Sequence, residues 1–167
     1  SRERGLSASR GLVESGVWFD ADQDGDLDLY LVYLGRAVDR VTPTPDGGNG
    51  SPNALYINEG GRFREATAGS GLEDSHWGWA SAAFDQDGDG REDLFLCNLW
   101  GPSRLFRALG GGRFKDVTAR AGVDIAALCK GASVGDADGD GHLDLVVSAL
   151  ARPQGAWRSF GPKAEEG

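Results

Sequence analysis

The chain has 167 residues, within the usual size of one domain, and its formal net charge of −9 argues against a surface that binds nucleic-acid phosphates. Its 27 glycines follow no collagen-like triplet, so they indicate many tight turns, as in all-β folds. No apolar run approaches the roughly 20 residues of a membrane-spanning helix, so we expect no membrane insertion. The chain has neither a methionine nor a signal peptide, and we therefore expect a mature or internal piece of a longer protein.

Three acidic segments recur along the chain. FDADQDGDLDLYLVYLG begins at Phe19, FDQDGDGREDLFLCNLW at Phe84 and GDADGDGHLDLVVSALA at Gly135, so their leading aspartates are 65 and 51 residues apart. NALYINEGGRFREATAGSGL (residues 53–72) and SRLFRALGGGRFKDVTARAGV (residues 103–123) follow the first two, and each indicates a β-hairpin with a glycine turn. A loop rich in Pro, Gly and Asn, residues 36–52, explains the longer first interval and is expected to be an exposed insertion.

One repeat unit is therefore a strand, an acidic loop, a second strand and a hairpin, which is the size of a four-stranded propeller blade. The strands expected after the loops, residues 27–34, 94–99 and 143–150, are apolar on both faces, as in a sheet packed between two others. We predict an all-β fold in a single repeat domain, residues 1–167. It comprises a blade over about 6–72 (insertion 36–52), a second over about 72–123 and an incomplete third over about 123–162. Propellers usually close with four to eight blades, so this chain is not expected to close alone.

The acidic segments share the pattern D-x-D-x-D-G-x-x-D without exception. Its aspartates are Asp20, Asp22, Asp24 and Asp28 in the first loop; Asp85, Asp87, Asp89 and Asp93 in the second; and Asp136, Asp138, Asp140 and Asp144 in the third. Ca²⁺ prefers six to eight oxygen ligands, and alternate aspartates around a sharp glycine turn provide such a set. We expect a backbone carbonyl from the seventh position to add a ligand, and the ninth-position aspartate to close the shell with both oxygens. The seventh-position residues are Asp26, Arg91 and His142.

One such loop alone could be a solvated acidic turn, but three in register within a repeat favour three calcium sites, which would take the net charge from −9 to −3. An EF-hand is excluded because its twelfth loop position is a glutamate on a helix. Here the twelfth residues are Leu31, Leu96 and Val147, in apolar strands.

These residues resemble the FG-GAP (VCBS) repeat family, whose members form the blades of integrin α-subunit propellers and of many bacterial secreted proteins. The combination of the acidic loop with LYxN, GGRF and DVTxxAGV is most similar to the cartilage acidic protein group. The resemblance implies a calcium-stabilised β-propeller outside the cytosol, with no catalytic residue. Phe19 and Phe84 match the aromatic residue before the loop, whereas Gly135 replaces it in the third repeat, where looser packing is expected.

Other residues leave alternatives open. Cys97 and Cys129 are expected on strands of adjacent blades, so either a disulfide or two buried thiols is possible. Asn49-Gly50-Ser51 is a formal N-glycosylation acceptor. The five tryptophans are expected to pack between blades, although Trp77 and Trp100 could instead form a glycan-binding surface.

The sequence thus predicts a non-catalytic calcium-binding scaffold at an extracellular, cell-surface or periplasmic location. Its partner would be a protein or a glycan, or other chains that complete the propeller. The alternative is an accessory domain or subunit of a larger secreted enzyme or surface complex. An enzyme in its own right is disfavoured, because no histidine or serine lies in a catalytic motif.

Overall fold

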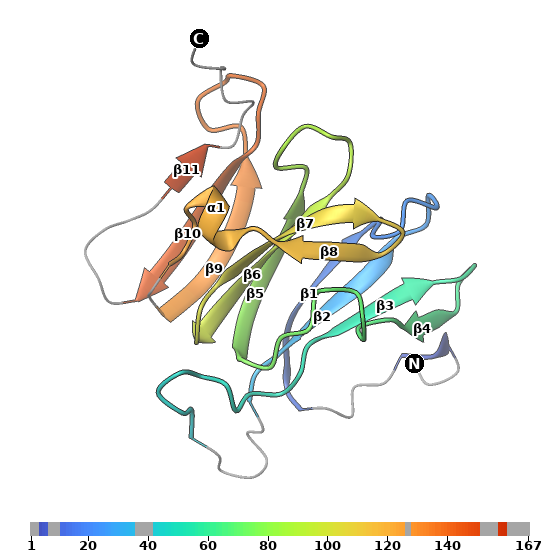
Figure 1. The fold of residues 1–167 in the computed structure, drawn as a ribbon, viewed down its shortest axis with the longest axis horizontal. Helices are drawn as coiled ribbons and strands as arrows, with labels where there is room; N and C mark the ends of the chain where they lie inside the picture. Colours follow the sequence, from blue (N-terminus) through green and yellow to red (C-terminus); the bar gives the residue numbers. More distant parts are fainter. Residues whose placement is uncertain (1–3, 7–10, 36–41, 126–127, 151–156, 160–167) are drawn as a thin grey trace.

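The computed structural model describes residues 4–6, 11–35, 42–125, 128–150 and 157–159, which form three antiparallel sheets (Figure 1). The first sheet contains β1 (Val13–Phe19), β2 (Asp28–Tyr33), β3 (Ala54–Asn58) and β4 (Phe63–Glu65), in that order. The second contains β5 (Trp77–Phe84), β6 (Asp93–Trp100), β7 (Arg104–Gly110) and β8 (Arg113–Asp116), again in chain order. The third has the order β11-β10-β9, from β9 (Leu128–Gly135), β10 (Asp144–Leu150) and β11 (Trp157–Ser159). One helical turn, α1 (Thr118–Ala121), follows β8.

Each acidic loop connects the first two strands of its sheet and is closed by the same residue pair in every repeat. The last residue of the leading strand faces the ninth-position aspartate. These pairs are Phe19–Asp28, Phe84–Asp93 and Gly135–Asp144. The predicted order of strand, acidic loop, strand and hairpin is therefore confirmed in the first two repeats, and the third shares the strand, acidic loop and second strand in the same register.

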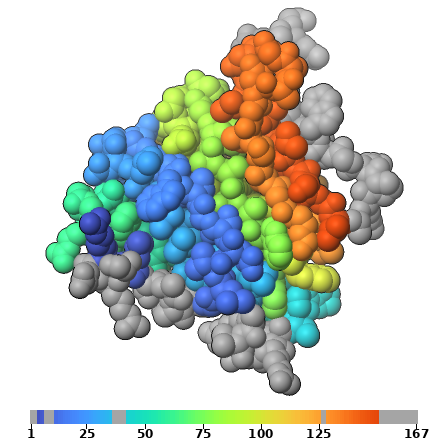
Figure 2. Space-filling model, turned by 180° about the vertical axis from the view of Figure 1, so that it is seen from behind, coloured from blue at the N-terminus to red at the C-terminus, as the bar shows by residue number. Residues whose placement is uncertain are grey.

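The core lies between the sheets. Successive side chains of β6 point to opposite faces, as in any strand. Leu94 and Leu96 pack with residues of the first sheet such as Tyr30, whereas Phe95 packs with residues of the third such as Leu145. The second sheet is thus buried on both faces, as the two-faced apolar pattern of its central strand predicted. From behind, the repeats form successive blue, green and orange bands (Figure 2).

Among the described residues, no sheet covers the outer face of the third sheet. Val146 follows Asp144 by two positions, as Tyr30 follows Asp28 and Phe95 follows Asp93. Tyr30 and Phe95 are fully buried by the next sheet, but Val146 is 49% exposed. Over the described residues the sheets form no closed ring (Figure 1). This arrangement is that of a partial propeller, as predicted.

The residue before each acidic loop differs in packing as expected. Phe19 and Phe84 are buried in the two inter-sheet cores. At Gly135 a β-carbon would have no neighbour within 4 Å, so the third loop begins without an aromatic anchor.

The hairpins are closed by a hydroxyl that the sequence patterns contained but did not explain. Thr67 Oγ1 accepts the N–H of Leu55 at 3.0 Å, and Thr118 Oγ1 accepts that of Leu105 at 2.9 Å. Both threonines are buried. Each hydroxyl ties the segment after the hairpin to the start of the third strand, which accounts for the threonine in the DVT motif.

Part of the expected insertion packs closely on the second sheet. Asn49 Oδ1 accepts a hydrogen bond from Trp77 Nε1 at 2.9 Å, and Ser51 is fully buried. Residues 36–41 lie outside the described part of the chain. Of the described insertion, only some residues are exposed, so the expectation of an exposed loop is only partly correct.

Other expectations concern residues that the structure does not describe. Parts of the first and third predicted blades, residues 7–10, 126–127, 151–156 and 160–162, fall in this category. The described residues include no helix that is both long and apolar enough to span a membrane.

Candidate metal centres

Each acidic loop brings three carboxylates together at one point. The oxygens of each group lie within 4.8 Å of one another. The groups are Asp20, Asp22 and Asp28; Asp85, Asp87 and Asp93; and Asp136, Asp138 and Asp144. They occupy positions one, three and nine, so the three repeats build the same cluster from the same positions.

The first aspartate of each loop organises the turn through backbone N–H groups. Asp85 Oδ1 accepts those of Gly88 at 2.8 Å and Asp89 at 3.2 Å, and its Oδ2 accepts that of Gly90 at 2.8 Å. The corresponding bonds occur in the first and third loops, from residues 23–25 to Asp20 and from residues 139–141 to Asp136. The loop therefore curls around its first carboxylate, and this curl brings the carboxylates of positions three and nine close to it.

Two positions in each loop adopt left-handed backbone. Position six is Gly25, Gly90 or Gly141, with φ of 93°, 82° and 88°, as the turn glycine predicted. Position four is also left-handed, with φ of 70° at Gln23 and 75° at Gly88. The sequence analysis missed this second requirement, although two glycines at position four, Gly88 and Gly139, were a visible signal.

The ninth-position aspartate connects the loop to the sheet. Asp93 Oδ2 accepts the N–H of Gln86 at 3.2 Å, and its Oδ1 accepts that of Ala108, on β7, at 2.7 Å. Asp28 makes the equivalent bonds to Ala21 and to Asn58 on β3. In the third repeat the bond from Ala137 to Asp144 Oδ2 is present at 2.8 Å. Among the described residues Asp144 Oδ1 has no hydrogen-bond partner, and the residue that corresponds to Ala108, Phe160, lies outside the described part of the chain.

Burial acts on the charge of these aspartates. It raises the pKa of Asp28, and it raises that of Asp93 to about 6. In both cases the two backbone hydrogen bonds oppose the rise and nearby aspartates add to it, each to a smaller extent. Burial, together with the charge of Asp24, also raises the pKa of Asp22. Desolvated carboxylates that repel one another are stabilised by a bound divalent cation. The donor set therefore fits Ca²⁺, which prefers oxygen ligands.

The remaining predicted ligands lie outside these clusters. Position five, which is Asp24, Asp89 or Asp140, contributes no oxygen to the three-carboxylate groups. Position seven was expected to act through its backbone carbonyl, and this stays a prediction for Asp26, Arg91 and His142. The ligation of a metal through both oxygens of the ninth-position aspartate also stays a prediction.

Contacts from the next repeat hold the first loop. The Asp20 N–H donates to Glu92 Oε2 at 3.1 Å, and the Gly112 N–H donates to the carbonyl of Ala21 at 3.2 Å. Glu92 belongs to the second acidic loop and Gly112 to the β7–β8 turn. The first cluster thus lies at the junction of the first and second sheets, a feature that depends on sheet packing and was not predicted.

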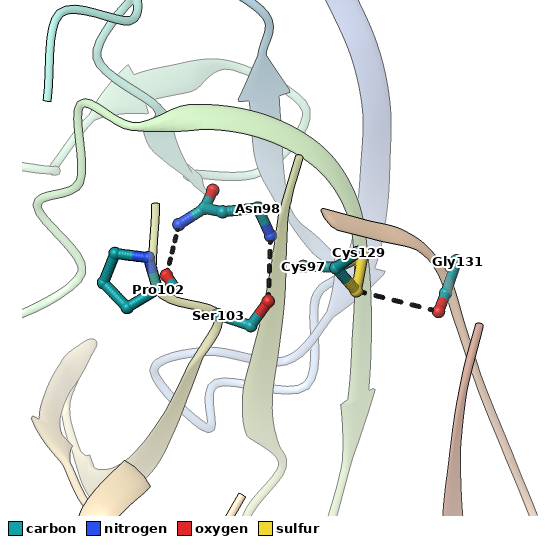
Figure 3. Close-up of a disulfide and its surroundings, with 6 residues drawn as sticks. All are labelled: Cys97, Asn98, Pro102, Ser103, Cys129 and Gly131. Carbon is teal, nitrogen blue, oxygen red and sulfur yellow. Dashed lines mark hydrogen bonds between the residues drawn. A yellow bond between two sulfur atoms is a disulfide. The ribbon is translucent and has the colours of Figure 1, made fainter. Parts of the chain in front are cut away.

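The two cysteines form a disulfide between β6 and β9 (Figure 3). Their Cα atoms are 5.4 Å apart, and both residues are fully buried. This bond decides between the two alternatives that the sequence left open, and it links the second sheet covalently to the third.

The glycosylation acceptor is engaged in the fold. Asn49 Nδ2 donates to the carbonyl of Thr42 at 2.9 Å, and its Oδ1 accepts from Trp77 as described above. Asn49 therefore has a structural role in holding the insertion against the second sheet.

The tryptophans do not all pack between sheets. Trp77 is buried, and the ring of Trp79 lies under Lys130 Nζ, 3.6 Å from the ring centroid. Trp18 and Trp100 are exposed, and nothing is described of the Trp157 side chain. A glycan surface that includes both Trp77 and Trp100 is therefore wrong, since Trp77 is not accessible.

Comparison with known proteins agrees with this geometry. The model of the FG-GAP-like repeat matches residues 20–96 and 85–147, a span that includes all three acidic loops. The chain belongs to the FG-GAP-like repeat family. Cartilage acidic protein 1 from Homo sapiens is 33% identical over 121 residues, which cover 69% of this chain and 18% of that protein. Cartilage acidic protein 1 from Mus musculus gives the same identity and coverage.

The family assignment confirms the resemblance seen in the acidic loops and hairpins. This FG-GAP-like chain corresponds to less than a fifth of the length of the two curated relatives. What those whole proteins do is therefore not transferred to it directly.

Proposed function

We propose that this chain is a non-catalytic, extracellular calcium-binding module that serves as a scaffold for protein or glycan recognition. The observation that supports it most is the same three-carboxylate cluster at the same loop positions in three FG-GAP-like repeats. Family membership and a relative named for cartilage favour an extracellular location. Each ion would join residues at both ends of a loop and so hold the first two strands of a sheet together.

Thermal unfolding with EGTA and then with Ca²⁺ tests the metal, with Mg²⁺ as the control ion. A site filled at a hundred times its dissociation constant contributes about 2.7 kcal/mol. For a chain of this size that corresponds to a rise in Tm of roughly 5–10 °C per site. We expect a rise of this order for each occupied loop with Ca²⁺ and a much smaller one with Mg²⁺. An unchanged Tm would refute calcium binding.

A pair of variants within one loop separates ligation from charge. Asp22 contributes an oxygen to the first cluster, whereas the Asp26 side chain does not. Asp22→Asn should remove about one site's share of the calcium-dependent rise. Asp26→Asn removes the same charge and should preserve most of it. Equal losses in both variants would show that the loop acts only through its net charge.

The recognition role needs a separate measurement. Membership of the FG-GAP-like repeat family and the similarity to cartilage acidic protein 1 favour a binding role over an enzymatic one. Calcium-dependent retention on a glycan array would identify a glycan ligand. Absence of glycan binding, together with a purified protein partner that binds only with Ca²⁺, would identify a protein ligand. Turnover of a substrate by the isolated chain would overturn the proposal.

A second candidate is an accessory domain or subunit of a larger secreted enzyme or surface complex. It is favoured by the open face of the third sheet around Val146 and by the short share of the relatives that the chain covers. The domain composition of the full-length protein distinguishes the two. A neighbouring catalytic domain would support the accessory role.

A further inference from the structure

The second acidic loop differs from the other two in the cations beside it. Arg107 Nε lies 2.7 Å from Asp87 Oδ2, an ion pair without hydrogen-bond geometry. Arg107 Nη2 also donates a hydrogen bond to Asp89 Oδ2 at 3.1 Å. Arg91 pairs with the same Asp89 oxygen. Two guanidinium groups therefore neutralise part of this loop, and one of them holds a carboxylate of the metal cluster.

The position of Arg107 beside the second acidic loop follows from the fold. Arg107 is on β7, and its neighbour Ala108 donates its N–H to Asp93, the ninth-position aspartate of the same loop. The strand register thus fixes the guanidinium beside the cluster. Arg107 is only about one-third exposed on its side chain, so it is held rather than freely solvated.

Among the described residues, neither of the other loops has a cation in an ion pair with a cluster carboxylate. The first-repeat residue at the matching hairpin position is Ile57, which is buried in the core. Arg64 on β4 pairs with Glu59, and its charge acts on Asp22 only as the smallest of the contributions to the pKa of that carboxyl. Opposite Asp144, β11 has Ser159. Among the described residues, no carboxylate of the first or third loop forms an ion pair with an arginine or a lysine.

We infer that Arg107 is an affinity-setting residue that makes the second loop the weakest of the three calcium sites. This inference depends on the proposed calcium binding. A divalent ion that uses Asp87 must displace the guanidinium or bind beside it, and either event weakens binding. The loss of two partly exposed ion pairs, together with repulsion between the ion and the guanidinium, should weaken Ca²⁺ binding at the second loop about tenfold. The first and third sites would then fill at lower Ca²⁺ concentrations than the second.

A site-resolved titration tests this order. The amide of the position-six glycine donates to the first aspartate of each loop, so the NMR signals of Gly25, Gly90 and Gly141 report the three sites separately. In the unmodified chain, the signal of Gly90 should respond last. In Arg107→Gln, its midpoint should move to about tenfold lower Ca²⁺, while those of Gly25 and Gly141 stay unchanged.

The control variant is Arg120→Gln, which removes the same charge from α1, where Arg120 is exposed and forms no ion pair with a described residue. It should leave all three midpoints unchanged. If Gly90 responds at the same or lower Ca²⁺ than the others in the unmodified chain, or if Arg107→Gln leaves its midpoint in place, the inference is wrong while calcium binding stands. If none of the three glycines responds, calcium binding itself is refuted.

Discussion

The left-handed backbone at position four gives a quantitative test of the loop geometry that needs no metal. Gln23 has φ of 70° in the first loop, where the second and third loops have Gly88 at 75° and Gly139 at 79°. A residue with a side chain loses roughly 1–2 kcal/mol in this conformation. Glycine avoids that cost but loses about 0.5–1 kcal/mol more backbone entropy on folding. Gln23→Gly should therefore stabilise the chain by about 0.5–1 kcal/mol.

The reverse change should have the opposite sign. A β-carbon at Gly88 would meet no atom within 4 Å, so Gly88→Gln introduces only the backbone cost and should destabilise by about 0.5–1 kcal/mol. Gly71 is also left-handed, but there a β-carbon would lie 2.2 Å from the carbonyl oxygen of Phe114. Gly71→Ala should therefore destabilise by about 2–4 kcal/mol, clearly more than Gly88→Ala.

Urea denaturation in EGTA measures all of these free energies of unfolding. EGTA removes any contribution of bound Ca²⁺, so the differences report backbone conformation alone. If Gln23→Gly lowers the stability, or if Gly88→Gln does not, the loop backbone differs from that described here.

Two further predictions concern the disulfide and the pair of His76 with Asp74. The disulfide joins two cysteines 32 residues apart, so replacement of both Cys97 and Cys129 by alanine releases this cross-link. The change should lower the free energy of unfolding by about 3–4 kcal/mol relative to the oxidised chain. An unchanged stability would show that the disulfide does not form. The hydrogen bond from His76 to Asp74 raises the pKa of His76 above 6.5, against a smaller opposing contribution from burial. Its contribution to stability is therefore present below pH 6.5 and is lost as the pH rises through the raised pKa. His76→Gln should flatten that part of a pH–stability profile, and an unaltered profile would contradict the pairing.

The repeat pattern predicted most of the fold because the same strand and acidic-loop signals occur three times in the sequence. The position of Phe19, Phe84 and Gly135 before the loops predicted both the strand ends and the weaker anchoring of the third loop. The apolar run after each loop predicted burial on two faces, which holds for β6 but not for β10, whose outer face has no neighbouring sheet among the described residues.

The parts that sequence could not provide depend on distances between strands. Cys97 and Cys129 are 32 residues apart in sequence, and only the packing of β9 on β6 shows that their Cα atoms come within 5.4 Å. Arg107 reads as an ordinary strand residue until the β6–β7 register places it beside Asp87. The insertion reads as polar and exposed, because nothing local indicates that Asn49 accepts from a buried tryptophan.

The bonds between the first loop and the second repeat have a consequence for how the chain opens. Since Ala21 and Gly112 share a backbone hydrogen bond across the sheet junction, the first two sheets separate only if that loop is disturbed. Repeat arrays behave as neighbours coupled in one dimension, and their ends open before their centres. Native-state amide exchange should therefore be slowest along β6, which has a sheet on either side, and fastest along β10, at the open end. Opening at that end frees β10 first, while the disulfide keeps β9 tethered to β6.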